Sequence, residues 1–175
     1  SQMLALQDVV QCKVYDNKTN STVDDIPPHY IWVIVQGGKS DEIAKVIYNN
    51  LPPGIGMKGD EEELVARAAS GQTETINFDI AKSTPLYIRA TIKQFTAAVI
   101  DTAFVKSELE KITFEIQEMA TTAEITTVMS NAIGDIGTPY NVELSADNST
   151  WAEYATPDNL DEFFAISAAN INLTV

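Results

Sequence analysis

The sequence is poor in the residues that build catalytic and metal sites. Among its 175 residues there is one histidine, His29, and one cysteine, Cys12. A multi-histidine metal site is therefore excluded, and any Ser/His/Asp or Cys/His set would have to be built around His29. A single cysteine also excludes an intrachain disulfide, which suits a reducing compartment. Cys12 lies in an alternating apolar run, where we expect a small buried thiol.

Basic residues are scarce as well. The chain has 11 lysine and arginine residues against 25 aspartate and glutamate residues, a formal net charge of -14. Binding to nucleic acid depends on lysine and arginine displacing counterions from phosphates, so this balance argues against a nucleic-acid partner. The same negative field disfavours anionic membrane surfaces. No stretch approaches the roughly 20 apolar residues of a membrane span, and we expect no targeting segment.

The first part of the chain predicts two strands. Residues 9–15 mix apolar and polar positions as a half-buried strand does. Because strand-like residues begin almost at once, we expect a piece of a longer protein. The run YIWVIV at 30–35 is continuously apolar and largely β-branched. It predicts a central strand covered on both faces.

A helix and a hairpin are expected next. Ser40 has acidic residues after it and apolar residues at helical spacing, so we expect it to cap a helix that ends before Pro52. Residues 63–69 and 73–80 flank a Ser-Gly-Gln turn. We expect a hairpin there, although helix propensity alone would favour a helix over the first of these segments.

The second part of the chain predicts a strand, two helices and further strands. Residues 85–94 alternate at period two, with four inward positions: Leu86, Ile88, Ala90 and Ile92. A helix capped by Asp101 or Thr102 is predicted from five core-facing positions: Val105, Leu109, Ile112, Ile116 and Met119. A second helix is predicted between a capping box formed by Thr121 and Glu124 and a C-terminal glycine, Gly134. Its apolar stripe consists of Ile125, Val128, Met129 and Ala132. Strands are then expected over these segments: 140–144, 151–154, 163–166 and 171–175.

This order of elements predicts an α+β fold. Helices are grouped among strands instead of alternating with each strand, which argues against a doubly wound parallel sheet. The length fits two small modules, and we expect them at 1–82 and 83–175. Each module should have an antiparallel or mixed sheet packed by one or two helices.

A glycine-rich segment resembles a nucleotide-binding pattern but lacks its context. Gly54, Gly56 and Gly59 match GxGxxG, which binds pyrophosphate where a strand precedes it and a helix begins after it. Here a predicted helix and a Pro-Pro pair come first, and the acidic run 60–63 follows. We therefore expect a connecting loop without nucleotide or any other cofactor.

The remaining polar candidates also favour structural roles. His29 follows two prolines and precedes the predicted central strand, so it is expected at a loop edge. No acidic group has the spacing of a known calcium loop, and we expect solvated acidic loops with no metal. The acidic groups are Asp24, Asp25, Asp60, Glu61, Glu62, Glu63, Asp158, Asp161 and Glu162. The two tryptophans, Trp32 and Trp151, are expected to serve in packing. We expect no catalytic residue.

Several segments together resemble one known family. The sequence DIPPHYIWVIVQGG at 25–38 enters a valine-rich strand from a Pro-Pro-His motif and leaves it at a Gly-Gly turn. An acidic start with an Ile-Ala pair follows at 41–44, then PGIG at 53–56 and TPLYIRATI at 84–92. This combination is similar to the middle and C-terminal regions of baseplate J-like proteins. Residues 158–175 resemble the closing strands of that family.

The resemblance implies a mechanical function. Baseplate J-like proteins form wedges that surround the central spike of contractile phage tails and related injection machines. The implied partners are other wedge proteins and copies of the same chain, with no small-molecule substrate, and the implied location is a virion baseplate assembled in the bacterial cytoplasm. Two alternatives are a small hydrolase using His29 with Asp24 or Asp25, and an extracellular carbohydrate-binding module.

Because copies of so acidic a chain repel one another, we expect a monomer or a weak oligomer in isolation.

Overall fold

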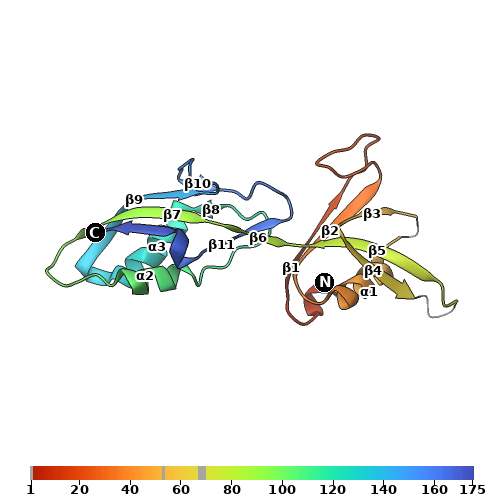
Figure 1. The fold of residues 1–175 in the computed structure, drawn as a ribbon, viewed down its shortest axis with the longest axis horizontal. Coiled ribbons are helices and arrows are strands. Elements are labelled where there is room, and N and C mark those ends of the chain that lie inside the picture. Colours follow the sequence, from red (N-terminus) through yellow and green to blue (C-terminus); the bar gives the residue numbers. More distant parts are fainter. Residues whose placement is uncertain (1, 53, 67–69) are drawn as a thin grey trace. The chain divides into compact units, whose positions relative to one another are not determined.

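A computed structural model describes residues 2–52, 54–66 and 70–175. The chain forms two compact units, Ser1–Lys82 and Ser83–Val175, called here the first and second units. Each is an α+β unit, as the sequence predicts, with helices and mixed or antiparallel sheets (Figure 1).

The first unit is built on a mixed five-stranded sheet with the order β1-β2-β5-β4, and β3 pairs with β2. Its elements are a short 3-10 helix η1 (Met3–Ala5), β1 (Val9–Asp16), β2 (Tyr30–Gly37), α1 (Ser40–Asn50), β3 (Gly56–Lys58), β4 (Glu61–Ala66) and β5 (Thr73–Ile80). β2 is antiparallel to β1 and parallel to both β3 and β5. The apolar run therefore forms a central strand, which confirms that prediction.

The helix α1 packs against one face of this sheet. Alternate residues of β2 point toward it, and Val33 and Val35 join a buried cluster with Ile43 and Ile47 of the helix. The capping residue of α1 is Lys39, whose backbone is extended, and no side chain caps the helix. The prediction that Ser40 caps this helix is therefore wrong by one residue, because Ser40 already has helical backbone geometry.

The predicted hairpin is present. β4 and β5 pair antiparallel from Glu61 opposite Phe78 to Ala66 opposite Thr73. Residues 67–69, which the prediction also included in the first strand, lie outside the described residues. Ile76 and Phe78 of β5 are fully buried in the same cluster as residues of α1. Antiparallel pairing with this anchored strand keeps the first segment extended as β4, in place of the helix that its local propensity favours.

The second unit has its helices on one face of a three-stranded sheet with the order β12-β7-β9 (Figure 1). Its elements from residue 82 onward are β6 (Lys82–Pro85), β7 (Tyr87–Gln94), α2 (Thr102–Leu109), β8 (Ala120–Thr121), α3 (Thr122–Ile133), η2 (Gly134–Ile136), β9 (Gly137–Ser145), β10 (Tyr154–Ala155), β11 (Glu162–Ala165), η3 (Ala168–Asn170) and β12 (Ile171–Thr174). β6 pairs with β11, and β8 pairs with β10.

The alternation predicted for β7 is confirmed. The inward residues of the predicted alternation are buried in one cluster with residues of α2 and α3; Leu86 directly precedes β7, and the others lie in it: Ile88, Ala90 and Ile92. The predicted caps are also found, since Asp101 accepts a hydrogen bond from the Phe104 amide at 3.0 Å and Thr121 accepts one from the Glu124 amide. Gly134 ends α3 with a positive φ of 64°, the conformation that favours glycine.

The long helix predicted over 105–119 is wrong in its second half. α2 ends at Leu109, and the chain continues as turns and extended segments. Gln117 has a φ of 58°, which a right-handed helix cannot contain, and its amide donates to the Glu162 carbonyl at 2.9 Å. Ile116 is buried as expected, but Met119 is 49% exposed and does not face the core.

Two predicted strands near the C-terminus are shorter than expected. In 151–154, Ala152 forms only an isolated bridge to Leu144, and the strand β10 begins at Tyr154. The closing strand keeps its alternation at Ile171, which is buried, but Val175 is exposed.

Candidate functional site

The loop before β2 holds the only histidine in a hydrogen-bonded turn. The side chain of the buried residue Asn17 donates to the carbonyls of Ser21 at 2.8 Å and Ile26 at 2.7 Å, which fixes the loop from within. His29 has a φ of 63°, and its Nε2 lies 3.0 Å from Oδ1 of Asn20. The geometry thus pairs the imidazole ring with an amide of the same loop.

The two aspartates of the hydrolase alternative lie in the same loop. Asp24 and Asp25 are exposed and have φ values of 50° and 59°. They lie between Val23 and Ile26, whose bridge closes this turn. Both residues therefore form the tip of the turn, and the ring of His29 forms its hydrogen bond with Asn20 instead.

The glycine-rich segment is part of the sheet. Gly56 begins β3, which pairs with β2, and a Cβ atom at this position would overlap the ring of Tyr30. A Cβ atom at Gly59 would overlap the backbone of Phe78 in β5. These glycines permit close approach of neighbouring strands, a structural reason for their presence. The segment follows a helix and leads into β4, so no helix N-terminus follows it.

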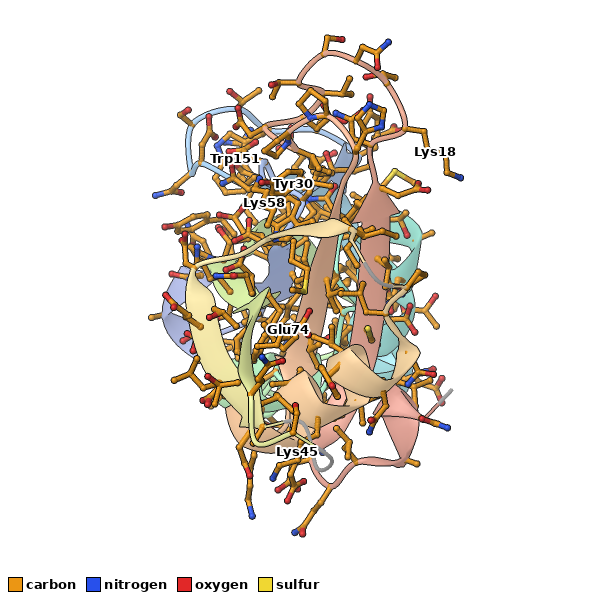
Figure 2. The ribbon with its side chains drawn as sticks, turned by 90° about the vertical axis from the view of Figure 1, so that its right-hand side faces the viewer. Lys18, Tyr30, Lys45, Lys58, Glu74 and Trp151 are labelled. Atoms are coloured by element: carbon orange, nitrogen blue, oxygen red, sulfur yellow. The ribbon has the colours of Figure 1, made fainter. Side chains whose placement is uncertain are left out.

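A polar cluster surrounds Trp32 at one end of the sheet in the first unit. The indole Nε1 donates to Oδ2 of the buried Asp79 at 2.6 Å, and the Asp60 amide donates to its Oδ1 at 2.7 Å. Lys58 Nζ lies 3.6 Å from the centre of the Trp32 ring. Figure 2 shows Lys58 and Tyr30 at this end and Lys45 on α1 at the other. The cluster links β2, β3 and β5 and therefore stabilises this end of the sheet.

The second unit has a related arrangement on the outer face of its sheet. Arg89 of β7 forms an ion pair of 2.6 Å with Glu143 of β9, its direct cross-strand neighbour. The guanidinium also lies 4.3 Å from the centre of the half-buried Trp151 ring. Arg89 holds the pKa of the Glu143 carboxyl below its usual value through the hydrogen bond and its charge.

The turn that carries Trp151 is organised by one carboxylate. Asp147 accepts hydrogen bonds from the amides of Ser149 and Thr150, both at 2.8 Å, and from the hydroxyl of Ser145 at 2.8 Å. These donors lower the pKa of the Asp147 carboxyl well below its usual value. The carboxylate stabilises this turn, a role that the sequence analysis did not predict.

The acidic groups singled out in the sequence do not converge. Glu61, Glu62 and Glu63 lie in β4, and Glu162 accepts hydrogen bonds from Asn159. Asp158 is exposed, whereas Asp161 is buried with an interaction partner. Among residues 2–52, 54–66 and 70–175, no group of three or more histidine, cysteine, aspartate or glutamate side chains lies so that it could hold a metal.

The first unit has an apolar groove beside α1, on the face of the sheet that the helix packs against. Its volume is about 440 Å³. Val14, Ile31 and Val33 line it from the sheet, and Val46 and Leu51 line it from α1 and the following residue. Val14 is 60% exposed. No charged residue is found among the described residues that line the groove.

The second unit presents an apolar loop between β7 and α2. Val99 is 89% exposed and Phe95 is 58% exposed, whereas Ile100 is buried in the core. The loop is nevertheless held in shape, because the Gln94 side chain donates to the carbonyls of Thr96 and Ala98, both at 2.6 Å. An exposed apolar loop with fixed geometry is a feature of contact surfaces.

Sequence reasoning assigned the apolar residues to the core and missed this loop and the groove. One signal was available, since no charged residue occurs from Gln94 to Ile100 in a strongly charged chain. The edges of the sheet in the first unit are a further feature, because β1 and β4 each pair on one side only within the described residues. Such edges can accept another strand.

No known family model matches this chain, and no curated protein matches it. Among the described helices, none has both the length and the apolar character required to cross a membrane.

Proposed function

We propose that this chain is a structural component of a contractile tail baseplate, or of the equivalent part of a related injection machine, and acts through protein–protein contacts. Its partners are other wedge proteins and copies of itself. Its place is the baseplate of the virion, assembled in the bacterial cytoplasm. The resemblance of residues 25–59 and 84–92 to baseplate J-like proteins is the ground for naming this machine.

One structural observation supports a function in contact surfaces. Large apolar side chains are exposed at positions with well-defined local structure in both units: Val10, Val14, Leu64, Phe95, Val99 and Phe104. Exposing apolar side chains to water has a free-energy cost that a partner removes by covering them. Two sheet edges, β1 and β4, add backbone groups that another chain can pair with.

The charge of the chain agrees with assembly among different proteins. A net charge of -14 disfavours close packing of many copies unless apolar surfaces or less acidic partners compensate. A wedge placed between other proteins receives such compensation. Interfaces of this kind are individually modest and become strong when several form at once.

The test is to locate the protein in a particle. Gold-labelled antibodies raised against this chain should mark the baseplate end of contractile tails purified from the source of the gene, seen by electron microscopy. Labelling of the sheath, of the head or of no tail would contradict the proposal. Particles assembled with His29→Ala should be labelled in the same way, whereas the hydrolase alternative requires a measurable turnover that this variant abolishes.

A further inference from the structure

We propose that the free edge of β4 binds an extended, basic segment of a partner protein, which adds to the sheet of the first unit as a further strand. The segment carries consecutive lysine or arginine residues next to a pair of apolar residues. The inference rests on the proposed function and deepens it, because it names the kind of segment that a partner brings to this chain.

β4 is an edge strand. Within the described part of the first unit it pairs with β5 alone, in an unbroken antiparallel register from Glu61 opposite Phe78 to Ala66 opposite Thr73. In such a pair, alternate residues direct their backbone N–H and C=O groups away from the neighbouring strand. These outward groups form a row with which another extended segment can pair, as in strand addition to a sheet edge.

The acidic residues of β4 occupy both faces of the sheet. Glu61 and Glu63 lie directly opposite Phe78 and Ile76, which are buried in one cluster with residues of α1. Direct partners in an antiparallel pair share a face, so these two glutamates lie on the helix side. Side chains alternate along a strand, so Glu62 lies on the other side. A segment that adds to this edge therefore meets carboxylates on both of its faces.

The charge of this edge is not balanced by cations of the described structure. Residues 59–66 include four acidic side chains and no basic one. No ion pair joins the glutamates at 61–63 to a described lysine, arginine or histidine. Lys45 of α1 lies within electrostatic reach of Glu63, but it forms its ion pair with Asp41 at 2.9 Å. A basic segment is attracted to this edge, whereas a second copy of this acidic chain is repelled.

The second half of β4 is apolar and open. Leu64 is 67% exposed, and Val65 is half-buried on the helix side. Partner residues beside these two positions remove apolar surface from water when they are themselves apolar. Because side chains alternate between faces, only consecutive basic residues can lie beside each of the glutamates at 61–63. The edge thus defines the order of basic and apolar residues in the segment that it binds.

Two short peptides test this order in both strand directions. The antiparallel probe is Thr-Val-Val-Lys-Lys-Lys and the parallel probe is Lys-Lys-Lys-Val-Val-Thr, each acetylated and amidated. The control, Lys-Val-Lys-Thr-Lys-Val, has the same composition but places all its lysines on one face. NMR titration of the isotope-labelled chain at low salt measures the affinities and locates the site. At least one probe should bind about tenfold more tightly than the control and shift the amides of 61–66. Equal affinities, or shifts confined to other residues, would overturn the proposal.

The contribution of backbone pairing is tested by N-methylation. A strand pairs with one neighbour through every second amide, so the better probe is made in two versions, methylated on opposite edges. At least one version should lose about tenfold or more in affinity, because the methyl group removes a donor that pairs with β4. If both versions bind as tightly as the unmodified peptide, charge alone attracts it and the edge is not its site.

Two charge-matched variants of the chain test the strand itself. The first carries Glu61→Gln, Glu62→Gln and Glu63→Gln. The second carries changes at exposed acidic positions of the second unit: Asp135→Asn, Glu153→Gln and Asp158→Asn. Each removes the same amount of negative charge, and circular dichroism checks that both fold. The first should lose about tenfold or more in affinity and the second less than about twofold. Equal losses would mean that net charge attracts the peptide, which contradicts a site at β4.

A second copy as the occupant has its own signature. Amide shifts of 61–66 that change with protein concentration in the absence of peptide would show self-pairing at this edge and would also overturn the proposal. All these measurements use the isolated chain, so their failure leaves the proposed baseplate function to the labelling experiment.

Discussion

The indole of Trp32 donates a hydrogen bond of 2.6 Å to the carboxylate of Asp79, and both side chains are buried. The two residues lie 47 positions apart in the sequence and join β2 to β5. The second carboxylate oxygen accepts from the Asp60 amide, so each oxygen of this buried group has a donor. A buried carboxylate needs such donors, because leaving it unpaired costs more free energy than a hydrogen bond contributes.

Replacing Trp32 by phenylalanine should therefore destabilise the protein. The change removes the donor and leaves one buried oxygen of Asp79 without it, at a cost of about 1–3 kcal/mol in the free energy of unfolding. Urea unfolding followed by circular dichroism measures this loss. Trp151→Phe is the control, since the Arg89 interaction with that half-buried ring is worth about 1 kcal/mol or less. Equal losses for the two variants would mean that the hydrogen bond to Asp79 contributes little.

The end of α2 gives a second prediction. Leu109 is fully buried in the core of the second unit, whereas Met119 is 49% exposed. Leu109→Ala should cost about 2–5 kcal/mol, because it removes buried methyl groups and leaves a cavity. Met119→Ala should cost less than about 0.5 kcal/mol, as surface changes do. Thermal and urea unfolding of both variants compares them directly, and a large effect at Met119 would instead support a continuous helix.

Elements with a clear period could be predicted from the sequence. Only a strand buries the apolar residues of the uninterrupted run of β2 and of the strict alternation of β7, and the sequence predicts both strands. The caps at Asp101, Thr121 and Gly134 were also found, because capping depends on residues close in the sequence.

The failure over 110–119 has a non-local cause. Ile112 and Ile116 fit a helical stripe, but the backbone of Gln117 is held by the Glu162 carbonyl and its side chain by the Pro157 carbonyl. Contacts 40 or more positions away cannot be read from local spacing. The exposed apolar loop between β7 and α2 and the apolar groove beside α1 were missed for the same reason. Val99 and Ile100 are adjacent apolar residues, and only the tertiary packing leaves one exposed and buries the other.

The turn at Asp147 predicts a specific dependence on pH. Its carboxyl has a folded-state pKa below the usual 3.8, so the ionised form stabilises the folded state. The contribution is fully present above about pH 4, near the unfolded-state pKa, and is lost as the pH falls below it toward the folded-state pKa. The carbon resonance of the carboxyl group, followed by NMR, should show this low pKa. Asp147→Asn should be less stable than the natural chain at pH 7, and this difference should shrink toward pH 2.

The close approach of β3 to β2 gives the last prediction. A Cβ atom at Gly56 would overlap the ring of Tyr30, so Gly56→Ala should cost about 1–3 kcal/mol through overpacking. The same substitution in a Tyr30→Ala background should cost less, because the overlapping ring is absent, and a double-mutant cycle measures this coupling. Gly54→Ala is the control, since a Cβ atom there meets nothing within 4 Å. Its positive φ of 84° makes the change unfavourable by itself, but the cost should be the same with or without the Tyr30 ring. If the cost of Gly56→Ala is also independent of Tyr30, the glycine does not serve this contact, and the role assigned to it in joining the two strands is wrong.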